Sequence, residues 1–358
     1  MKKKLYIPGP VEVGTDVLNA MAAPMIGHRT KDYAALHKKV VTGLKTLLNT
    51  EDPVFLSTSS AFGVMEGAVR NLVQKRCASF GNGAFSEKWH DVAVRCGLEA
   101  DLFKADWGKP ITASMVDDAL STGKYDAMTV VHNETSTGVM SPLYEIAEVM
   151  RKYPDVTFIV DAVSSMSAVK LDVSELKTDV LLAGVQKAFG LPPGLAVFTV
   201  SPKALEKAKG TKNRGYYFDF VEFQTNDLKD NTPSTPALSI IYGLEHQLDK
   251  MMKEGLENRY ERHRKMAERT REWILSQGFG LFAAEGARSN TLTSGANDDK
   301  TDLEKLKKLA GERGYAIDNG YGKIKNKTFR IAHMADFTQA DLDEIYGVLE
   351  ELLPQARS

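Results

Sequence analysis

The sequence predicts an α/β protein, in which a large domain with a mostly parallel sheet is joined to a smaller C-terminal α+β domain. Apolar strand patterns alternate with helical patterns from residue 53 to residue 200, as βαβ units do. Polar clusters directly follow four of these apolar runs. Beyond residue 237 a long helical pattern leads to a shorter mixture of strands and helices. We therefore expect an N-terminal arm at 1–20, a large domain at 21–255 and a small domain at 256–358.

The composition is that of an ordinary globular protein. The chain has 358 residues, of which 43% are hydrophobic and 26% are charged, and its formal net charge of -1 provides no basic surface for nucleic acid. No apolar stretch approaches the roughly 18 residues that would cross a bilayer, and the start MKKKLYIPGP lacks the apolar core of a signal peptide. Cys77 and Cys96 form no C-x-x-C pair, and the seven histidines show no ligand spacing. We expect a cytoplasmic protein without a metal site.

The first regular element is expected after the irregular arm, as a helix over Lys31–Leu48. One face of that helix repeats apolar residues at helical spacing. They are Tyr33, Leu36, Val40, Leu44, Leu47 and Leu48. The basic pair His28-Arg29 lies in the loop before this helix. Such a pair is usually plain surface, but a loop arginine is also an anion ligand.

The next strand, Pro53–Thr58, leads directly into a helix that ends near Leu72. The junction is Ser59-Ser60-Ala61, and small hydroxyl residues at a strand-to-helix junction offer donors to an anion. The alternative is that Ser59 or Ser60 only caps the helix, which is the commoner outcome.

A partial glycine motif follows the strand Ala78–Phe80. The sequence Gly-Asn-Gly-Ala-Phe-Ser at 81–86 resembles a dinucleotide fingerprint, but Ser86 stands where the third glycine belongs. We therefore reject a dinucleotide site, and expect a helix from this loop through Cys96. Phe85, at the loop tip, is either a core residue or a ring available for stacking.

Three further strands carry the most informative polar clusters. After Ala127–His132 the chain reads Asn-Glu-Thr-Ser-Thr-Gly, which includes Thr135 and Ser136. After Val156–Val160 come Asp161 and Ser164; after Val180–Ala183 come Gln186 and Lys187, before the strand Leu195–Val200. Helices are expected between these strands at 114–120 and 143–151. Because parallel strand ends share one edge of a sheet, these clusters are expected to face one crevice.

Lys187 is the residue around which this site is organised. Its ammonium lies between two apolar runs, where burial is costly unless the amine loses its proton or forms an imine. The alternative is a lysine at a strand end whose ammonium reaches water.

The C-terminal part begins with a loop-rich region at 203–236 and one long helix at 237–277. Strands are expected near 281–283, 290–293 and 328–332, and helices at 302–311 and 339–353. In the strand Thr328–Ala332, Phe329 and Ile331 point to one face and Arg330 to the other. A lone arginine there is more often solvated surface than a functional group.

Together these groups suit pyridoxal 5′-phosphate. The aldehyde of the cofactor would condense with Lys187, and Asp161 would keep the pyridine nitrogen protonated so that the ring accepts electrons. Ser59 and Ser60 would hold the phosphate, and Phe85 would stack over the ring.

The segments NETSTG, VDAVSS and AGVQKAFGLPPG, in this order, resemble class V aminotransferases of pyridoxal-phosphate fold type I. The resemblance covers nearly the whole chain and implies a seven-stranded sheet and a homodimer with shared active sites. It implies Lys187 as the Schiff-base lysine, Asp161 as the pyridinium partner and Arg330 as the ligand of the substrate carboxylate. The other cofactor ligands that it implies are Ser59, Ser60, Ala61, Phe85, Thr135 or Ser136, Ser164, Gln186 and, from a neighbouring subunit, Asn231 and Thr232.

Two branches of the family remain open for the substrate. His28-Arg29 and the stretch NTPST resemble the phosphoserine aminotransferases, where the basic pair helps to bind substrate phosphate. The stretch LPPGLA resembles the alanine/serine–glyoxylate branch, and position 60 is a serine where the phosphoserine branch has an arginine. A dianionic substrate needs several fixed cations, so we favour a small, uncharged amino-acid donor and an acceptor such as glyoxylate or pyruvate.

Single residues help to distinguish other reactions that proteins of this fold catalyse. A cysteine desulfurase needs a nucleophilic cysteine near the small domain, and no cysteine follows Cys96. A lyase or hydrolase with the same cofactor stays open. A non-catalytic relative would lack Lys187 or Asp161, and both are present.

Overall fold

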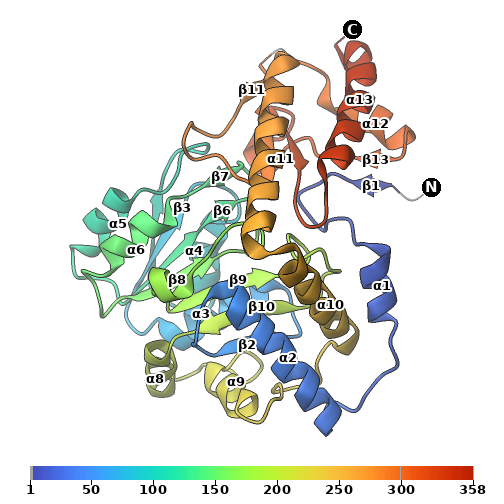
Figure 1. The fold of residues 1–358 in the computed structure, drawn as a ribbon. Coiled ribbons are helices and arrows are strands. Elements are labelled where there is room, and N and C mark those ends of the chain that lie inside the picture. Colours follow the sequence, from blue (N-terminus) through green and yellow to red (C-terminus); the bar gives the residue numbers. More distant parts are fainter. Residues whose placement is uncertain (1–2, 299, 358) are drawn as a thin grey trace.

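A computed structural model describes residues 3–298 and 300–357 (Figure 1). Residues 1–2 of the predicted arm and residues 299 and 358 of the predicted small domain lie outside this description. Within the described chain, the main sheet has seven strands in the order β2-β10-β9-β8-β5-β3-β4. Their bounds are β2 Val54–Ser57, β3 Cys77–Gly81, β4 Ala100–Lys104, β5 Ala127–Val131, β8 Thr157–Asp161, β9 Val180–Gly184 and β10 Ala196–Val200.

The sheet is mostly parallel, as the sequence predicts. β4, β3, β5, β8 and β9 pair in parallel, and β10 pairs antiparallel with both β9 and β2. The register sets Asp161 beside Val131 of β5 and Leu182 of β9. The carboxyl ends of β5, β8 and β9 therefore meet at one edge of the sheet.

Helices cover both faces of the main sheet (Figure 1). In β8, Phe158 and Val160 pack with the helices of one face, and Ile159 packs with those of the other. This two-sided burial explains why the strands are continuous apolar runs in the sequence. The first face is covered by α1 Thr15–Met21, α2 Lys31–Leu48, α5 Ala113–Leu120, α6 Leu143–Met150, α7 Val173–Leu176 and α10 Leu238–Glu254; the second by α3 Ala61–Leu72, α4 Glu87–Arg95, α8 Pro202–Gly210 and α9 Phe220–Asp227.

The C-terminal part has its own sheet and hydrophobic cluster. The long helix α11 links it to the main sheet (Figure 1). Phe329 and Ile331 pack into its cluster, whereas Arg330 lies between them on the opposite face of its strand. The elements are α11 Leu256–Ser276, β11 Gly280–Leu281, β12 Leu292–Ala296, α12 Leu303–Glu312, β13 Tyr315–Ala316, the 3₁₀ helix η1 Gly322–Ile324, β14 Thr328–Ala332 and α13 Gln339–Ala356.

Three expectations about local structure need correction, and one strand of the main sheet was not predicted. The arm is not wholly irregular, because β1 Lys4–Leu5 pairs with β13 and α1 packs on α10. The region 203–236 contains most of α8 and all of α9. The single helix at 237–277 is two helices, because Gly255 has a φ of +84°, which an α-helix cannot continue. A strand, β4, lies at the edge of the sheet, where its half-exposed side chains give no apolar run.

Two small elements complete the fold around the polar cluster after β5. β6 Asn133–Glu134 and β7 Val139–Met140 form an antiparallel pair that closes the loop at 135–138. No helix among the described residues combines the length and the apolar character that crossing a membrane requires.

Candidate active site

A cavity of about 300 Å³ lies at the carboxyl ends of β5, β8 and β9. All four predicted polar clusters contribute residues to its wall, and the first does so through Ser60, the N-cap residue of α3. The wall also includes two residues of the N-terminal arm. The lining residues are Gly9, Pro10, Ser60, Ala61, Phe62, Met65, Phe85, Val131, Asn133, Thr135, Asp161, Val163, Gln186, Lys187 and Pro193.

Lys187 follows β9 by three residues, and its amine lies at the wall of the cavity under the N-terminal arm. Its Nζ donates a hydrogen bond to the carbonyl oxygen of Pro8. Gly9 lies so close that a Cβ there would be 2.8 Å from the Lys187 Cδ. Burial, reinforced by the charge of Arg330, lowers the pKa of Lys187 to about 8, against the opposing effect of Asp161. A neutral amine is therefore accessible near neutral pH.

Asp161 is the last residue of β8, and only 6% of it is exposed. Its carboxylate accepts hydrogen bonds from the Trp89 indole Nε1 at 3.2 Å and from the Val163 backbone N–H at 2.9 Å. Burial raises the pKa of Asp161 to about 6, although these two donors act to lower it. The carboxylate is held in one orientation beside the cavity, and a cationic partner there would stabilise its charged form.

Asn133 lines the same cavity with a side chain that is 1% exposed. Among the described residues, neither its Nδ2 nor its Oδ1 has a hydrogen-bond partner. A buried amide without partners costs about 1–3 kcal/mol, so its presence indicates a ligand that supplies them. Next to it, the hydroxyls of Thr135 and Ser164 are 2.5 Å apart.

The start of α3 offers an anion site at the cavity wall. Ser60 is its N-cap residue, but the Ser60 side chain accepts no hydrogen bond from the helix backbone. At the N-termini of α2 and α5, by contrast, Thr30 and Thr112 cap the helix with their side chains. The N–H of Gly63 donates to the carbonyl of Ser60, so the N–H groups of Ala61 and Phe62 are the ones left for an anion, which the positive end of the helix dipole also favours.

Phe85 lies at the mouth of the cavity in an aromatic cluster. Its ring stacks on Tyr321 with centroids 5.2 Å apart, and the Lys88 ammonium lies 5.0 Å from its centroid. The backbone of this loop is held by the buried carboxylate of Glu134, which accepts from Ser86 N at 2.7 Å and from Phe85 N at 3.2 Å. The ring is therefore fixed by its loop rather than by packing in the core.

Arg330 reaches the same region from β14. It is 4% exposed, and its Nε donates to Asp318 at 2.7 Å while its Nη1 donates to the carbonyl of Thr135 at 2.9 Å. No polar contact to its Nη2 is found in the described part of the chain. The residue is not part of the cavity wall itself, but it bonds the backbone of a residue that is.

Several predicted residues lie away from this cavity. Ser59 bonds to Ser57 and to the carbonyl of Ser60, and Ser136 donates to Glu134 at 2.7 Å. Of the predicted alternatives, Thr135 lines the cavity and Ser136 does not. Neither the His28-Arg29 loop nor the pair Asn231 and Thr232 forms part of the wall.

Comparison with known proteins gives the family. The sequence profile described as "Aminotransferase class-V" matches residues 17–344. The chain belongs to the class V aminotransferases.

The relatives of this class V aminotransferase match over most of their length. An uncharacterized aminotransferase of Methanocaldococcus jannaschii is 38% identical, over 93% of this chain and 88% of its own. A serine–glyoxylate aminotransferase of Methylorubrum extorquens is 32% identical, over 95% of this chain and 88% of its own. The solved structure of an alanine–glyoxylate aminotransferase from Nostoc sp. superposes with a TM-score of 0.94 at 26% identity, over 99% of this chain and 96% of that one.

The cofactor of this family is pyridoxal phosphate, and the cavity fits it. The wall presents an amine, a carboxylate with a raised pKa, an uncapped helix start and an amide without partners. These are groups that an aldehyde, a pyridine nitrogen, a phosphate and a ring hydroxyl respectively require.

Sequence reasoning missed five residues that shape this site. They are Trp89, Asn133, Glu134, Asp318 and Tyr321. Asn133 and Glu134 lie inside the polar cluster that the sequence analysis singled out, so a signal existed for them. The other three act through contacts between distant segments, for which the sequence pattern gives no sign.

Proposed function

We propose that this class V aminotransferase moves an amino group between a small amino acid of the alanine or serine type and a 2-oxo acid such as glyoxylate or pyruvate. The observation that carries the proposal is the single cavity whose wall includes both the Lys187 amine and the Asp161 carboxylate. When bound, pyridoxal phosphate supplies an electrophilic carbon for the amine and a ring that accepts electrons.

Lys187 would serve first as the amine that holds the cofactor and then as the general base. An amine with a pKa of about 8 is near the optimum for moving a proton to and from the substrate Cα at neutral pH. The hydrogen bond to the carbonyl of Pro8 and the contact with Gly9 keep the amine oriented and limit its access to water.

Asp161 would hold a proton on the pyridine nitrogen. The bonds from Trp89 and Val163 leave the carboxylate oriented beside the cavity, and a cationic ring nitrogen would offset the cost of its burial. Asn133 and Thr135 would bond the polar edge of the ring, Phe85 would stack on its face, and Ser60, Ala61 and Gln186 would surround the phosphate.

Arg330 would bind the substrate α-carboxylate. Its Nε is oriented by Asp318, and its Nη2 is left to donate to an anion. The guanidinium fork is suited to a carboxylate, and the preformed bonds reduce the entropy lost on binding.

The charges around the cavity support a small donor. Lys187 is the one cationic residue in the wall as described, and Ser60 in that wall stands where the phosphoserine branch has an arginine. The relative from Methylorubrum extorquens and the structure from Nostoc sp. both carry glyoxylate in their names.

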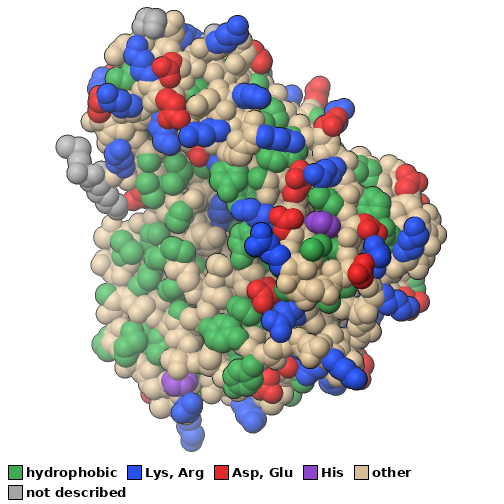
Figure 2. Space-filling model, turned by 180° about the vertical axis from the view of Figure 1, so that it is seen from behind, with side chains coloured by type: hydrophobic (Ala, Val, Ile, Leu, Met, Phe, Trp, Pro, Cys, Tyr) green, Lys and Arg blue, Asp and Glu red, His purple; other side chains and the backbone are tan. Residues whose placement is uncertain are grey.

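We also propose a cytoplasmic homodimer in which Asn231 and Thr232 reach the active site of the partner. In their own chain these residues lie outside the cavity, and the cavity residue Phe62 leaves 40% of its surface exposed. In Figure 2, hydrophobic side chains gather on the lower left of the face, whereas charged side chains are frequent at its right and over its upper part.

A panel of donors and acceptors tests the substrate class. With the protein loaded with pyridoxal phosphate, serine or alanine with glyoxylate should give kcat/KM at least about 100-fold above phosphoserine with 2-oxoglutarate, because a dianion lacks its cations here. A preference for phosphoserine would overturn the proposed donor. Elimination or hydrolysis without amino transfer would overturn the proposed reaction. Sedimentation of the loaded protein as a monomer would contradict the dimer.

A further inference from the structure

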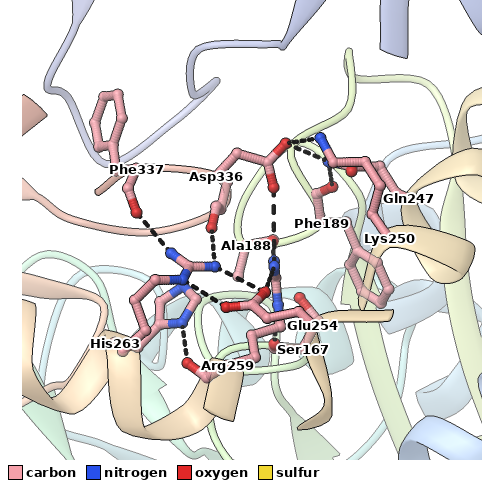
Figure 3. Close-up of polar contacts among 12 residues, drawn as sticks. Ser167, Ala188, Phe189, Gln247, Lys250, Glu254, Arg259, His263, Asp336 and Phe337 are labelled. Atoms are coloured by element: carbon pink, nitrogen blue, oxygen red, sulfur yellow. Dashed lines mark hydrogen bonds and ion pairs between the residues drawn. The ribbon is translucent and has the colours of Figure 1, made fainter. Parts of the chain in front are cut away.

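Arg259, in the first turn of α11, is a fully buried arginine outside the cavity. It is 1% exposed, and its guanidinium lies between two loops of the large domain (Figure 3). Its Nε donates to the carbonyl of Ser167 at 2.8 Å, and its Nη2 donates to the carbonyl of Ala188 at 2.7 Å. Burying a guanidinium is costly, so a site that keeps one requires both of these bonds and a counter-charge.

The two carbonyls belong to the loops that carry the proposed catalytic groups. Ala188 is the residue after Lys187, and Ser167 lies in the turn at 163–168, which follows Asp161 in the chain. Ser167 has a φ of +74°, a left-handed conformation that costs a non-glycine residue about 1–2 kcal/mol. An ionic hydrogen bond to its carbonyl compensates for that strain and holds the turn in place.

An arginine is required for this bridge because its donors point in fixed, separate directions in one plane. A lysine has a carbon where arginine has Nε, and its ammonium stands where arginine has Cζ, so it would keep neither carbonyl bond in good geometry. The counter-charge comes from Glu254, 3.2 Å from Nη1, and from Asp336, 3.8 Å away. Gln247 connects Asp336 to the loop that carries Lys187. Its Nε2 donates both to Asp336 at 3.2 Å and to the carbonyl of Phe189 at 2.8 Å.

Arg262, one turn further along α11, offers a matched comparison. It also binds Glu254, with its Nε 2.6 Å from the carboxylate. Its other donors go to the carbonyls of Phe337 at 2.6 Å and Ala335 at 3.1 Å, which follow β14. Arg262 therefore shares the helix, the counter-charge and the type of bond with Arg259, but makes no hydrogen bond to either catalytic loop.

We propose that Arg259 is a positioning residue that fixes Lys187 relative to Asp161 by holding the backbone of both loops with one guanidinium. The proposal rests on the proposed function for the roles of those two residues. Since about 1 Å of misplacement of reacting groups can cost about 100-fold in rate, such a bridge contributes to catalysis without touching the substrate.

The first test measures the bridge itself, in the protein without added cofactor. Hydrogen exchange is followed at the amides of residues 162–168 and 187–191, several of which bond within their own turns, as Met166 N does to Ala162 O and Gly190 N to Lys187 O. Arg259→Lys should increase exchange in both segments by about 10-fold or more, which matches the loss of one ionic hydrogen bond. Arg262→Lys should leave both segments at the wild-type rate.

The second test measures its effect on catalysis in the loaded enzyme. Arg259→Lys should lower kcat by about 10-fold while the KM of the amino acid stays within about threefold, because Arg330 is not displaced. Arg262→Lys should change neither by more than about twofold, as expected of a substitution that leaves both catalytic loops in place.

The exchange measurements distinguish a positioning role of Arg259 from a purely structural one. Faster exchange throughout the protein, or in only one of the two segments, would reduce Arg259 to a structural residue and overturn the proposal. Wild-type exchange in both segments with Arg259→Lys would overturn it as well. If Arg259→Lys does not fold, Arg259→Met, which has a similarly long side chain but no donor, is measured in the same way and judged by the same criteria. A wild-type protein without transaminase activity would refute the proposed function, whereas the exchange comparison would still decide whether the bridge exists.

Discussion

The two ends of the main sheet both bury a carboxylate near a lysine, but they treat the pair in opposite ways. At the amino end, Asp126 precedes β5 and Lys207 lies 3.0 Å from its carboxylate. At the carboxyl end, Asp161 closes β8 and Lys187 follows β9, with the cavity between their elements. The same residue types at opposite edges of one sheet thus form a closed ion pair and an open pair of reactive groups.

At the amino end of the sheet, the Asp126 carboxylate has a full set of hydrogen-bond and ion-pair partners. Asp126 accepts from three successive backbone N–H groups, those of Gln74, Lys75 and Arg76, at 2.9 to 3.0 Å. Burial acts to raise the pKa of Asp126, but these donors and Lys207 outweigh it, so the pKa is below its usual value. Such a carboxylate stabilises the fold and has no capacity left for a ligand.

At the carboxyl end of the sheet, Asp161 and Lys187 have fewer partners. Burial dominates there, so that the pKa of Asp161 rises to about 6 and that of Lys187 falls to about 8. Each charged form is destabilised until a ligand supplies the missing partner. The difference between the two ends is therefore in how many partners the fold supplies to each pair, and not in the residue types themselves.

The strongest challenge to this contrast is to remove each lysine in turn. Lys187→Ala should lower kcat by about 10⁴-fold, since it removes the residue that we propose both to hold the cofactor and to act as general base. The visible absorbance band of the loaded protein should disappear with it. Steady-state kinetics and an absorbance spectrum check both effects.

Lys207→Ala is the matched control at the other end. It should retain full activity per folded molecule but lower the free energy of unfolding by about 3 kcal/mol, because it leaves the buried Asp126 without its ion pair. If Lys207→Ala lost activity while remaining stable, or Lys187→Ala kept it, the distinction between the two ends would be wrong.

The two aspartates should respond to pH with opposite sign. In the cofactor-free protein, Asp161 binds its proton more tightly when folded, so stability should fall as pH rises from about 4 to about 6 and remain lower above that range. Asp161→Asn should remove this dependence and stabilise the protein at pH 7 by about 3 kcal/mol, while lowering kcat of the loaded enzyme by about 100-fold. Urea unfolding across this pH range measures the effect.

Asp126→Asn should do the reverse. The folded pKa of Asp126 is lowered, so its contribution to stability is present above the pKa of the unfolded chain and is lost as pH falls through the folded value. The substitution should destabilise the protein at pH 7 and leave kcat unchanged. A destabilised Asp161→Asn protein at pH 7 would show that its carboxylate is as well paired as that of Asp126.

The smallest expected effect concerns Arg330, whose Nε and Nη1 have hydrogen-bond partners and whose Nη2 is left for a ligand. Arg330→Ala should raise the KM of the amino acid by about 30-fold, the equivalent of one ionic hydrogen bond to its carboxylate, with little change in the affinity for pyridoxal phosphate. Substrate saturation curves and a cofactor titration separate the two. An unchanged KM would show that Arg330 does not bind the substrate and only bonds to Asp318 and Thr135.

Sequence reasoning captured the parts of this protein that local patterns determine. The strands β2, β3, β5, β8, β9 and β10 are apolar runs because the sheet is covered on both faces, and the polar residues that end them mark one edge. The pattern of strand ends was therefore sufficient to group Lys187, Asp161, Thr135 and Ser60, and all four line one cavity.

The remainder depends on contacts between distant segments. The pairing of β1 with β13 joins residues more than 300 positions apart, and nothing in the sequence of either strand indicates it. The bond from Trp89 to Asp161 is of the same kind. Gly255 is different, since a single glycine in a helical pattern is often tolerated, and only the packing of α10 and α11 makes it a break.

The position of Gly9 has a consequence for how the protein is handled. Any side chain there would collide with the Lys187 amine, and the backbone on either side of it forms part of the roof above that amine. The segment around residues 8–10 thus covers the amine that we propose as the reactive group. Proteolytic trimming or a bulky fusion placed against this segment would expose the nucleophile to solvent, although every strand of the main sheet would remain intact.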